Sequence, residues 1–354
     1  MKKKILIIDD SALMRRVICD IISSDDRFEV VDTAHDGVEG FNLICRNHYD
    51  AIVLDIYMPR MTGLELLMEM QKSRISANVL VASTTTKEGA RETMLALEYG
   101  ALEFIQKPES VLETKSDTFK SRFLQLLEVV AGVDQRKPVL PREEVKPVTP
   151  MIRKSTTPVS VSGKKLIAIA SSTGGPKALQ DVIPRLPEGI MAPILLVQHM
   201  PKGFTKSLAE RLNELSTVPV KEYVDGEELL AGHVYVAQGG KHMKAVYRGA
   251  KVCVVSSDEP AREGVKPCAN YMYESLRDCP YDEIICVVLT GMGSDGTAGI
   301  KSLREKKRVR IIAQNEETCA VYGMPKSIVA TGYADSVVPI DAVAEEIIKN
   351  VGVR

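Results

Sequence analysis

Residues 166–175 read Leu166-Ile167-Ala168-Ile169-Ala170-Ser171-Ser172-Thr173-Gly174-Gly175, an apolar run followed directly by hydroxyl and glycine residues. An unbroken apolar run that stops at a turn signal is typical of a strand buried on both faces of a parallel sheet. The two glycines mark a tight turn, after which a helix can start with free backbone N–H groups. The stretch therefore predicts a strand–turn–helix unit whose turn exposes a hydroxyl side chain.

The same pattern recurs downstream of this stretch. Two further strand–helix pairs are predicted, Ile194–Val197 with Thr205–Leu215 and Ile284–Leu289 with Thr297–Arg304. Between them, Val234–Ala237 and the pair Lys244–Tyr247 and Lys251–Val255 predict a small antiparallel insertion that turns at Arg248-Gly249-Ala250. This half of the chain is therefore expected to be an α/β unit with a mostly parallel sheet.

The first part of the chain also alternates strands with helices. Its short apolar runs are Ile5–Ile8, Val30–Val31, Ile52–Leu54, Val79–Val81 and Phe104–Ile105. The segments with helical spacing are Ala12–Ile22, Val38–Cys45, Leu64–Met70, Ala90–Leu97 and Phe119–Val130. These (βα)5 units predict a parallel sheet covered on both faces, with any active site beyond the carboxyl ends of the strands.

Between the two α/β parts the composition changes sharply, near residue 131. From there to about residue 163, prolines recur among charged and hydroxyl residues, at Pro138, Pro141, Pro147, Pro150 and Pro158. Such a segment cannot bury enough apolar surface to offset its ordering entropy. The sequence thus predicts a first domain over residues 1–125, an extended linker over 126–163 and a second domain over 164–354.

The overall composition excludes several classes of protein. The 354 residues include 46 Lys and Arg against 47 Asp and Glu, so no basic surplus points to a nucleic-acid partner. The seven cysteines are odd in number and lack metal-binding spacing, which favours buried thiols in a reducing cytosol. No apolar stretch reaches the roughly 20 residues that span a bilayer. We therefore expect a cytoplasmic protein with no direct membrane insertion.

Polar residues end the strands of the first domain. Asp9 and Asp10 follow the first strand, Asp55 ends the third, Ser83 follows the fourth and Lys107 the fifth. In a parallel sheet these residues converge on one edge, although any aspartate taken alone could be a helix N-cap. Carboxylates can hold Mg²⁺ and attack a phosphoryl group, while a cation and a hydroxyl contact the product. The ordered set therefore predicts phosphorylation of an aspartate.

On these residues and the Lys107-Pro108 pair, residues 1 to about 125 resemble a response-regulator receiver domain. The resemblance implies that Asp9, Asp10 and Asp55 bind Mg²⁺. It also implies that a chemotaxis histidine kinase phosphorylates Asp55, and that Ser83 and Lys107 sense the phosphoryl group.

Three residues of the second domain follow strand ends and suit nucleophilic catalysis. Ser172 sits at the glycine-rich turn, His199 follows the strand Ile194–Val197, and Asp295 follows the strand Ile284–Leu289. A serine can attack a carbonyl when a histidine takes its proton and N–H groups hold the oxyanion. Taken singly, Ser172 and Asp295 could cap helices, and His199 could be a buried structural histidine.

Other chemistries have weaker support in this domain. Gly174-Gly175 does not complete the nucleotide-binding pattern G-x-x-x-x-G-K-[ST], and no H-E-x-x-H metal motif is present. His233 and His242 lack ligand spacing and are expected to be structural.

The second domain resembles the catalytic domain of the chemotaxis protein-glutamate methylesterases (CheB). The motifs that carry the resemblance are Ser172-Thr173-Gly174-Gly175, Gln198-His199-Met200-Pro201, Gly203-Phe204-Thr205, Val234-Tyr235-Val236-Ala237, Gly239-Gly240 with His242, Leu289-Thr290-Gly291-Met292-Gly293 and Asp295-Gly296. The resemblance covers residues 164 to about 350 and, with the receiver, nearly the whole chain.

The resemblance implies a phosphorylation-activated hydrolase that removes methyl esters from glutamates of chemoreceptors and deamidates glutamines. Ser172 is then the nucleophile, His199 the general base and Asp295 its orienting partner. The N–H groups of Thr173 and Met292 hold the oxyanion, and no cofactor is expected for the esterase reaction. The partners implied are methyl-accepting chemoreceptors as substrates and the histidine kinase as phosphodonor.

The sequence departs from the family pattern at two places. Ala170-Ser171 precedes the nucleophile where the family has Gly-Ala, which leaves a second hydroxyl beside Ser172. Pro267-Cys268-Ala269-Asn270 replaces the usual Pro-Ser-Val-Asp, so no substrate contact is carried over to it.

Three rival functions remain open at this point. The second domain could dock without catalysis, it could bind DNA, or it could hydrolyse a different ester or amide. The complete set of Ser172, His199 and Asp295 disfavours the first, and the charge balance with the α/β pattern disfavours the second.

Overall fold

The computed structural model describes residues 1–84, 86–108, 116–133 and 163–353. Most of the predicted linker, residues 134–162, lies outside this part of the chain. Among the described residues, no helix is both long enough and apolar enough to cross a membrane.

The first unit is the predicted five-stranded parallel sheet, with strand order β2-β1-β3-β4-β5. Its strands are β1 (Lys3–Ile8), β2 (Phe28–Ala34), β3 (Ala51–Asp55), β4 (Val79–Ser83) and β5 (Glu103–Gln106). Its helices are α1 (Ala12–Ser23), α2 (Gly37–Arg46), α3 (Gly63–Lys72), α4 (Lys87–Glu98) and α6 (Asp117–Gly132). Apolar residues of α1 and α6 pack on one face of the sheet, and those of α2, α3 and α4 on the other.

Helix α6 extends the first unit beyond the predicted boundary at residue 125. It continues past residue 125, and Leu126, Leu127 and Val130 pack in the same core cluster as Ile5 and Val53. A boundary at 125 would remove these side chains from the core they complete. We therefore propose Gly132 as the end of the first domain.

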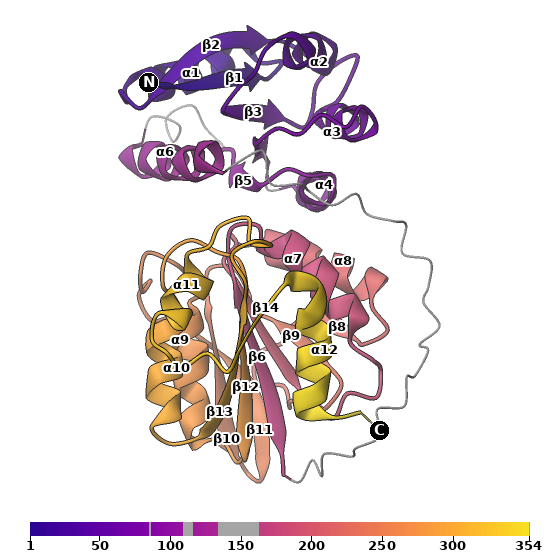
Figure 1. Ribbon diagram of the computed structural model, residues 1–354, viewed down its shortest axis with the longest axis vertical. Helices are drawn as coiled ribbons and strands as arrows, with labels where there is room; N and C mark the ends of the chain where they lie inside the picture. Colours follow the sequence, from indigo (N-terminus) through magenta and orange to yellow (C-terminus); the bar gives the residue numbers. More distant parts are fainter. Residues whose placement is uncertain (85, 109–115, 134–162, 354) are drawn as a thin grey trace.

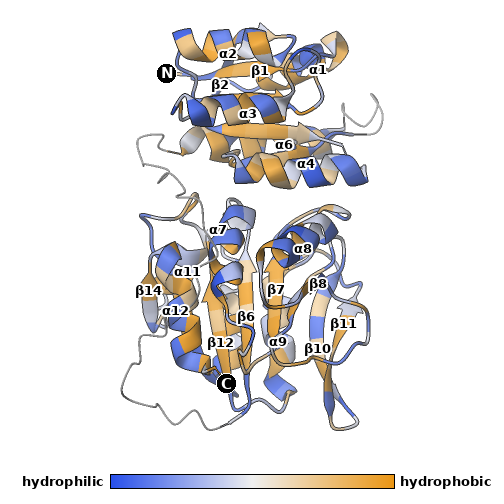
Figure 2. Ribbon diagram, turned by 90° about the vertical axis from the view of Figure 1, so that its right-hand side faces the viewer, coloured by the Kyte–Doolittle hydropathy of each residue, from blue (hydrophilic) through white to orange (hydrophobic). Residues whose placement is uncertain are grey.

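The second unit is built on a seven-stranded sheet with strand order β14-β13-β12-β6-β7-β9-β8. Its strands are β6 (Lys165–Ser171), β7 (Ile194–Gln198), β8 (Val220–Glu222), β9 (Val234–Val236), β12 (Glu283–Val288), β13 (Arg308–Gln314) and β14 (Ser336–Val338). The pairings between neighbouring strands are parallel. The central strands are apolar on both faces because helices cover both, as the orange strands of Figure 2 show.

Helices α7 (Gly175–Val182), α8 (Phe204–Leu215) and α12 (Ile340–Val351) cover one face of this sheet, and α9 (Ala269–Ser275), α10 (Thr297–Arg304) and α11 (Met324–Val329) cover the other (Figure 1). This arrangement follows from the alternation of apolar residues along β6. Ile167 and Ile169 face the α7 side, while Leu166, Ala168 and Ala170 face the α9 side.

The predicted antiparallel insertion is confirmed in part. Strands β10 (His242–Arg248) and β11 (Lys251–Ser257) form a hairpin in which Arg248 pairs with Lys251, so Gly249 and Ala250 make the turn. The assignment of Val234–Ala237 to this insertion was wrong. As β9, this segment pairs in parallel with β7 and β8 and belongs to the main sheet.

Figure 1 shows α4 and β5 of the first unit facing the α7 and α8 end of the second. An aromatic contact and an ion pair join these elements. The rings of Phe104 and Phe204 lie 4.5 Å apart between centroids, and Arg211 of α8 pairs with Glu98 at 2.8 Å.

Candidate active site

Ser172 lies in the turn between β6 and α7. The turn depends on Gly174, whose φ of 74° is a conformation that side-chain-bearing residues rarely adopt. Ser172 is partly exposed, whereas its neighbour Ser171 is fully buried and donates a hydrogen bond to Oε1 of Gln198 over 2.7 Å. Of the two adjacent hydroxyls, only that of Ser172 is available to a substrate.

The loop after β12 runs against the backbone of Ser172. The Ser172 N–H donates to the carbonyl of Thr290 over 3.0 Å. At Gly291, a Cβ atom would stand 2.7 Å from Cβ of Ser172, closer than real Cβ contacts allow. A glycine is therefore required at this position, and it brings the Met292 backbone beside the serine.

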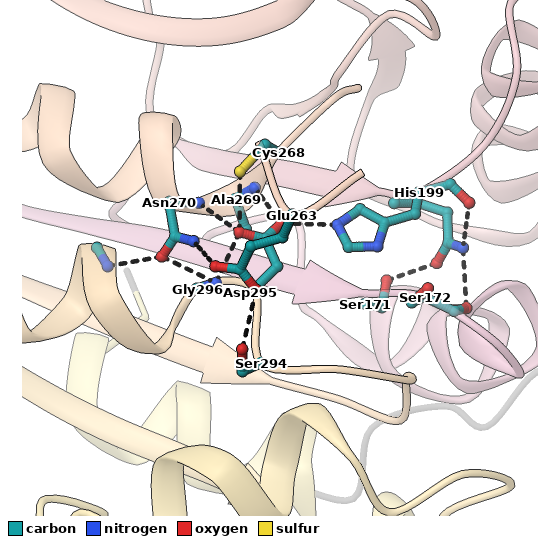
Figure 3. Close-up of polar contacts among 12 residues, drawn as sticks. Ser171, Ser172, His199, Glu263, Cys268, Ala269, Asn270, Ser294, Asp295 and Gly296 are labelled. Atoms are coloured by element: carbon teal, nitrogen blue, oxygen red, sulfur yellow. Dashed lines mark hydrogen bonds and ion pairs between the residues drawn. The ribbon is translucent and has the colours of Figure 1, made fainter. Parts of the chain in front are cut away.

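His199 and Asp295 form the central contact of the site. Nε2 of His199 lies 2.7 Å from Oδ2 of Asp295, and both side chains are almost completely buried. Figure 3 shows the imidazole between the Asp295 carboxylate and Ser172. Because Nε2 is bonded to Asp295, Nδ1 is the ring nitrogen left for a proton from the serine.

The structure thus brings the three predicted residues together, and a hydrogen bond joins His199 to Asp295 but not Ser172 to His199. Hydrogen bonds between a nucleophile and its base are often loose without substrate and tighten when substrate binds. The described geometry suits an acyl-transfer site in its substrate-free state.

Asp295 is held by more donors than His199 alone. The N–H of Ala269 donates to Oδ2 over 2.6 Å, and the N–H of Asn270 and the thiol of Cys268 donate to Oδ1 over 2.9 and 3.0 Å. Burial raises the pKa of the Asp295 carboxyl, but the hydrogen bonds from His199, Cys268 and Ala269 outweigh it and hold the pKa below its usual value. Asp295 therefore stays ionised and fixed.

The residues around Asp295 were not identified from the sequence. Asn270 also accepts from the N–H groups of Gly296 and Gly299 with its side-chain oxygen, over 3.1 and 2.6 Å. The available signal was the run Pro267-Cys268-Ala269-Asn270 itself, which stood out only by its departure from the family pattern.

The predicted oxyanion donors flank the serine. Thr173 is buried and starts the turn, while Met292 is exposed at the tip of its loop. Among the described residues, neither backbone N–H donates a hydrogen bond that would occupy it. Both remain free to bind an oxygen that carries developing negative charge.

A second cluster lies at the carboxyl edge of the first sheet. Nζ of Lys107 is 2.8 Å from Oδ2 of Asp9 and 2.8 Å from Oδ2 of Asp55. Asp9, Asp10 and Asp55 offer oxygen atoms that all lie within 4.8 Å of one another. Several carboxylate oxygens at this spacing are what a hard divalent cation such as Mg²⁺ prefers.

Burial raises the pKa of Asp55 to about 6; the charge of Lys107 opposes this rise and the charge of Asp9 adds to it. The carboxylate that a phosphoryl acceptor needs therefore predominates above about pH 6. Ser83 lies at the same edge, but its hydroxyl faces α4, where Thr93 donates to it over 2.5 Å. The predicted sensor is thus connected to α4, the helix that faces the second unit.

Elements of the first unit cover the approach to Ser172. Nε2 of Gln125 in α6 lies 3.9 Å from the sulfur of Met292. Glu103 of β5 makes a hydrogen bond with the Thr173 side chain, and burial raises the pKa of its carboxyl. A side-chain carboxyl group of the first unit therefore reaches the turn that carries the candidate nucleophile.

Comparison with known proteins finds matches over both units, including the regions that hold the two clusters. The CheB methylesterase family model matches residues 167–347, and the response regulator receiver domain model matches residues 5–116. A protein-glutamate methylesterase/protein-glutamine glutaminase of Syntrophomonas wolfei is 41% identical over 351 residues, which cover 98% of this chain and 99% of that protein. The protein-glutamate methylesterase/protein-glutamine glutaminase of Bacillus subtilis is 38% identical over 350 residues, which cover 97% of each chain.

Among solved structures, the crystal structure of the Thermotoga maritima CheB methylesterase catalytic domain matches with a TM-score of 0.51 and 43% identity. The match covers 53% of this chain and 99% of that one. The likeness therefore extends over both units in sequence, and over the second unit in solved three-dimensional structure.

Proposed function

The chain belongs to the CheB methylesterase family, and we propose that its reaction is carried out by Ser172, His199 and Asp295. The family and the α/β fold expected from the sequence are confirmed. The protein is a chemotaxis methylesterase and glutaminase with a response-regulator receiver domain. The residues that perform each step, and the partners, are proposals.

The contact between His199 and Asp295, at the strand edge that also carries Ser172, is the observation that supports this site most strongly. In the proposed reaction, Nδ1 of His199 takes the proton of the Ser172 hydroxyl as its oxygen attacks the methyl-ester carbonyl. Asp295 keeps the remaining N–H of the imidazole directed at its own carboxylate and stabilises the protonated ring.

The tetrahedral oxyanion would be bound by the N–H groups of Thr173 and Met292, and His199 would return its proton to the leaving methanol. The resulting glutamyl ester of Ser172 is then attacked by water, with His199 again as base, and glutamate is released. With a glutamine substrate the leaving group is ammonia, and the remaining steps are the same.

In the receiver, Asp9, Asp10 and Asp55 would hold Mg²⁺, which neutralises phosphoryl oxygens when bound. Asp55 is the proposed phosphoryl acceptor, and Lys107 contacts it directly. A chemotaxis histidine kinase is the proposed phosphodonor, and methyl-accepting chemoreceptors are the proposed substrates. The cytoplasm is the proposed location of the enzyme itself.

The test is release of labelled methanol from radiomethylated receptor membranes, with and without a small-molecule acyl phosphate. We expect wild-type protein to release methanol faster with the acyl phosphate, because phosphorylation of Asp55 alters contacts that cover Ser172. Asp55→Asn should release methanol slowly under both conditions, since an amide cannot accept the phosphoryl group. Normal activation of Asp55→Asn would exclude Asp55 as the switch, and no release by wild type would exclude receptor methyl esters as the substrate.

The ion pair between Arg211 and Glu98 offers a test of the covering contact itself. We expect Arg211→Gln to raise methanol release without the acyl phosphate by up to about fivefold, since a partly exposed ion pair contributes about 1 kcal/mol. The rate with the acyl phosphate should stay unchanged. Arg310→Gln is the matched control, because Arg310 pairs with Asp335 within the second unit. Equal basal rates for wild type and Arg211→Gln would show that this pair does not restrain the enzyme.

A further inference from the structure

Cys268 touches the aspartate of the proposed triad. Its sulfur lies 3.0 Å from Oδ1 of Asp295, whereas His199 contacts Oδ2 of the same carboxylate (Figure 3). Cys268 is completely buried and is the N-cap residue of α9. Its backbone is extended, and its side chain makes no capping bond to the helix. The thiol is thus directed at Asp295 rather than at the helix that it precedes.

We propose that Cys268 is a positioning residue of the esterase. Its S–H donates to Oδ1 of Asp295 and keeps Oδ2 aligned with Nε2 of His199. This inference rests on the proposed triad and adds a residue to it. The thiol contributes a donor without a charge, so it orients the carboxylate while leaving the negative charge of Asp295 to act on the imidazole.

The chemistry of the site keeps this thiol protonated. Burial, and then the charge of Asp295 and the hydrogen bond to it, raise the pKa of Cys268 far above its usual value. A thiolate at this position would be repelled by the neighbouring charge of Asp295. At neutral pH Cys268 is therefore a hydrogen-bond donor and not a nucleophile.

The backbone of Cys268 is fixed by a second buried side chain. The N–H of Cys268 donates to Nδ1 of His242 over 3.2 Å, and Nε2 of His242 lies 3.1 Å from the carbonyl of Pro260. A backbone N–H can only donate and a carbonyl can only accept, so His242 must be neutral with its proton on Nε2. Burial lowers the pKa of His242, which favours the same neutral form. A continuous series of contacts therefore runs from Pro260 through His242 and Cys268 to Asp295.

Cys268 could instead act only as a small apolar filler of the core. The two roles differ in what a hydroxyl does at this position. If Cys268 only fills space, activity should survive its replacement by alanine and suffer when serine places a polar hydroxyl there. If Cys268 acts as a hydrogen-bond donor, alanine should remove the bond to Asp295 and serine should restore it. A buried thiol away from the triad supplies the matched control. Cys279 is equally buried, and its sulfur donates to the carbonyl of Ser275 over 3.6 Å.

The experiment compares full-length wild type with Cys268→Ala, Cys268→Ser and Cys279→Ala. We expect Cys268→Ala to lower kcat for methanol release by about tenfold with little change in KM, since a hydrogen bond to a charged group is lost. Cys268→Ser should retain kcat within about threefold of wild type, because a hydroxyl is a better donor than a thiol. Cys279→Ala should keep the wild-type kcat.

A second readout does not require activity. The low-field proton resonance of the His199 Nε2–H reports its hydrogen bond to Asp295. We expect this resonance to move in Cys268→Ala and to stay in place in Cys279→Ala. If wild type releases no methanol, the proposed function fails while the resonance still tests Cys268. Equal kcat and an unmoved resonance in Cys268→Ala, or a Cys268→Ser variant as slow as Cys268→Ala, would overturn the proposal.

Discussion

Ser172→Ala is expected to reduce methanol release from methylated receptors to the background rate, a loss of about 10⁶-fold in kcat. The two neighbouring hydroxyls are not available to attack the ester. Ser171 is fully buried and hydrogen-bonded to Gln198, and Thr173 is buried and hydrogen-bonded to Glu103. The residual rate would come from the oxyanion donors and substrate binding alone. Single-turnover assays with radiomethylated membranes measure this loss.

Ser171→Ala is the matched control, since it removes a neighbouring hydroxyl of the same kind. It should lower kcat by no more than about tenfold, the effect of one neutral hydrogen bond. That bond holds Gln198, whose Nε2 donates to the carbonyl of Ser172 over 2.9 Å. A large loss in Ser171→Ala with a near-normal rate in Ser172→Ala would reverse the assignment of the nucleophile.

The proximity of the three proposed catalytic residues could be predicted from the sequence because each of them follows a strand of one parallel sheet. Apolar runs identify β6, β7 and β12, and the carboxyl ends of parallel strands share one edge. Ser172 and His199 come directly after β6 and β7, and Asp295 lies in the loop that follows β12, so their proximity could be predicted without knowledge of side-chain packing. The same reasoning placed Asp9, Asp55 and Lys107 together in the first unit.

The support around Asp295 could not be predicted in this way. Cys268 and Asn270 follow no strand of the main sheet, and they reach Asp295 only because α9 packs beside α10. Strand β9 was assigned to the wrong sheet for a related reason. Its apolar run shows that it is buried, but the run does not distinguish parallel pairing with β7 from antiparallel pairing with a hairpin.

Asp295→Asn is expected to lower kcat by about 10⁴-fold, through the tautomer of His199 rather than through the loss of charge alone. At the Oδ1 position the aspartate accepts from three donors, the thiol of Cys268 and the N–H groups of Asn270 and Gly296. If the amide NH₂ of the asparagine took that position, its hydrogens would face all three donors, and none of the three hydrogen bonds could form. At the Oδ2 position it would oppose one donor, the N–H of Ala269, so the NH₂ is expected there and donates to Nε2 of His199.

An imidazole that accepts at Nε2 must carry its proton on Nδ1, the nitrogen that faces Ser172, and so it cannot act as the base.

The substitution also removes a stabilising charge. Because the folded pKa of Asp295 is lowered from 3.8, its contribution to stability is complete above about pH 4 and disappears as the pH falls through the folded pKa. Urea unfolding should therefore show Asp295→Asn less stable than wild type at pH 7, with the difference shrinking as the pH falls below 4. If the difference in the free energy of unfolding were the same at pH 7 and in strong acid, Asp295 would not hold a depressed pKa. If kcat of Asp295→Asn stayed within about tenfold of wild type, its contact with His199 would not control the tautomer.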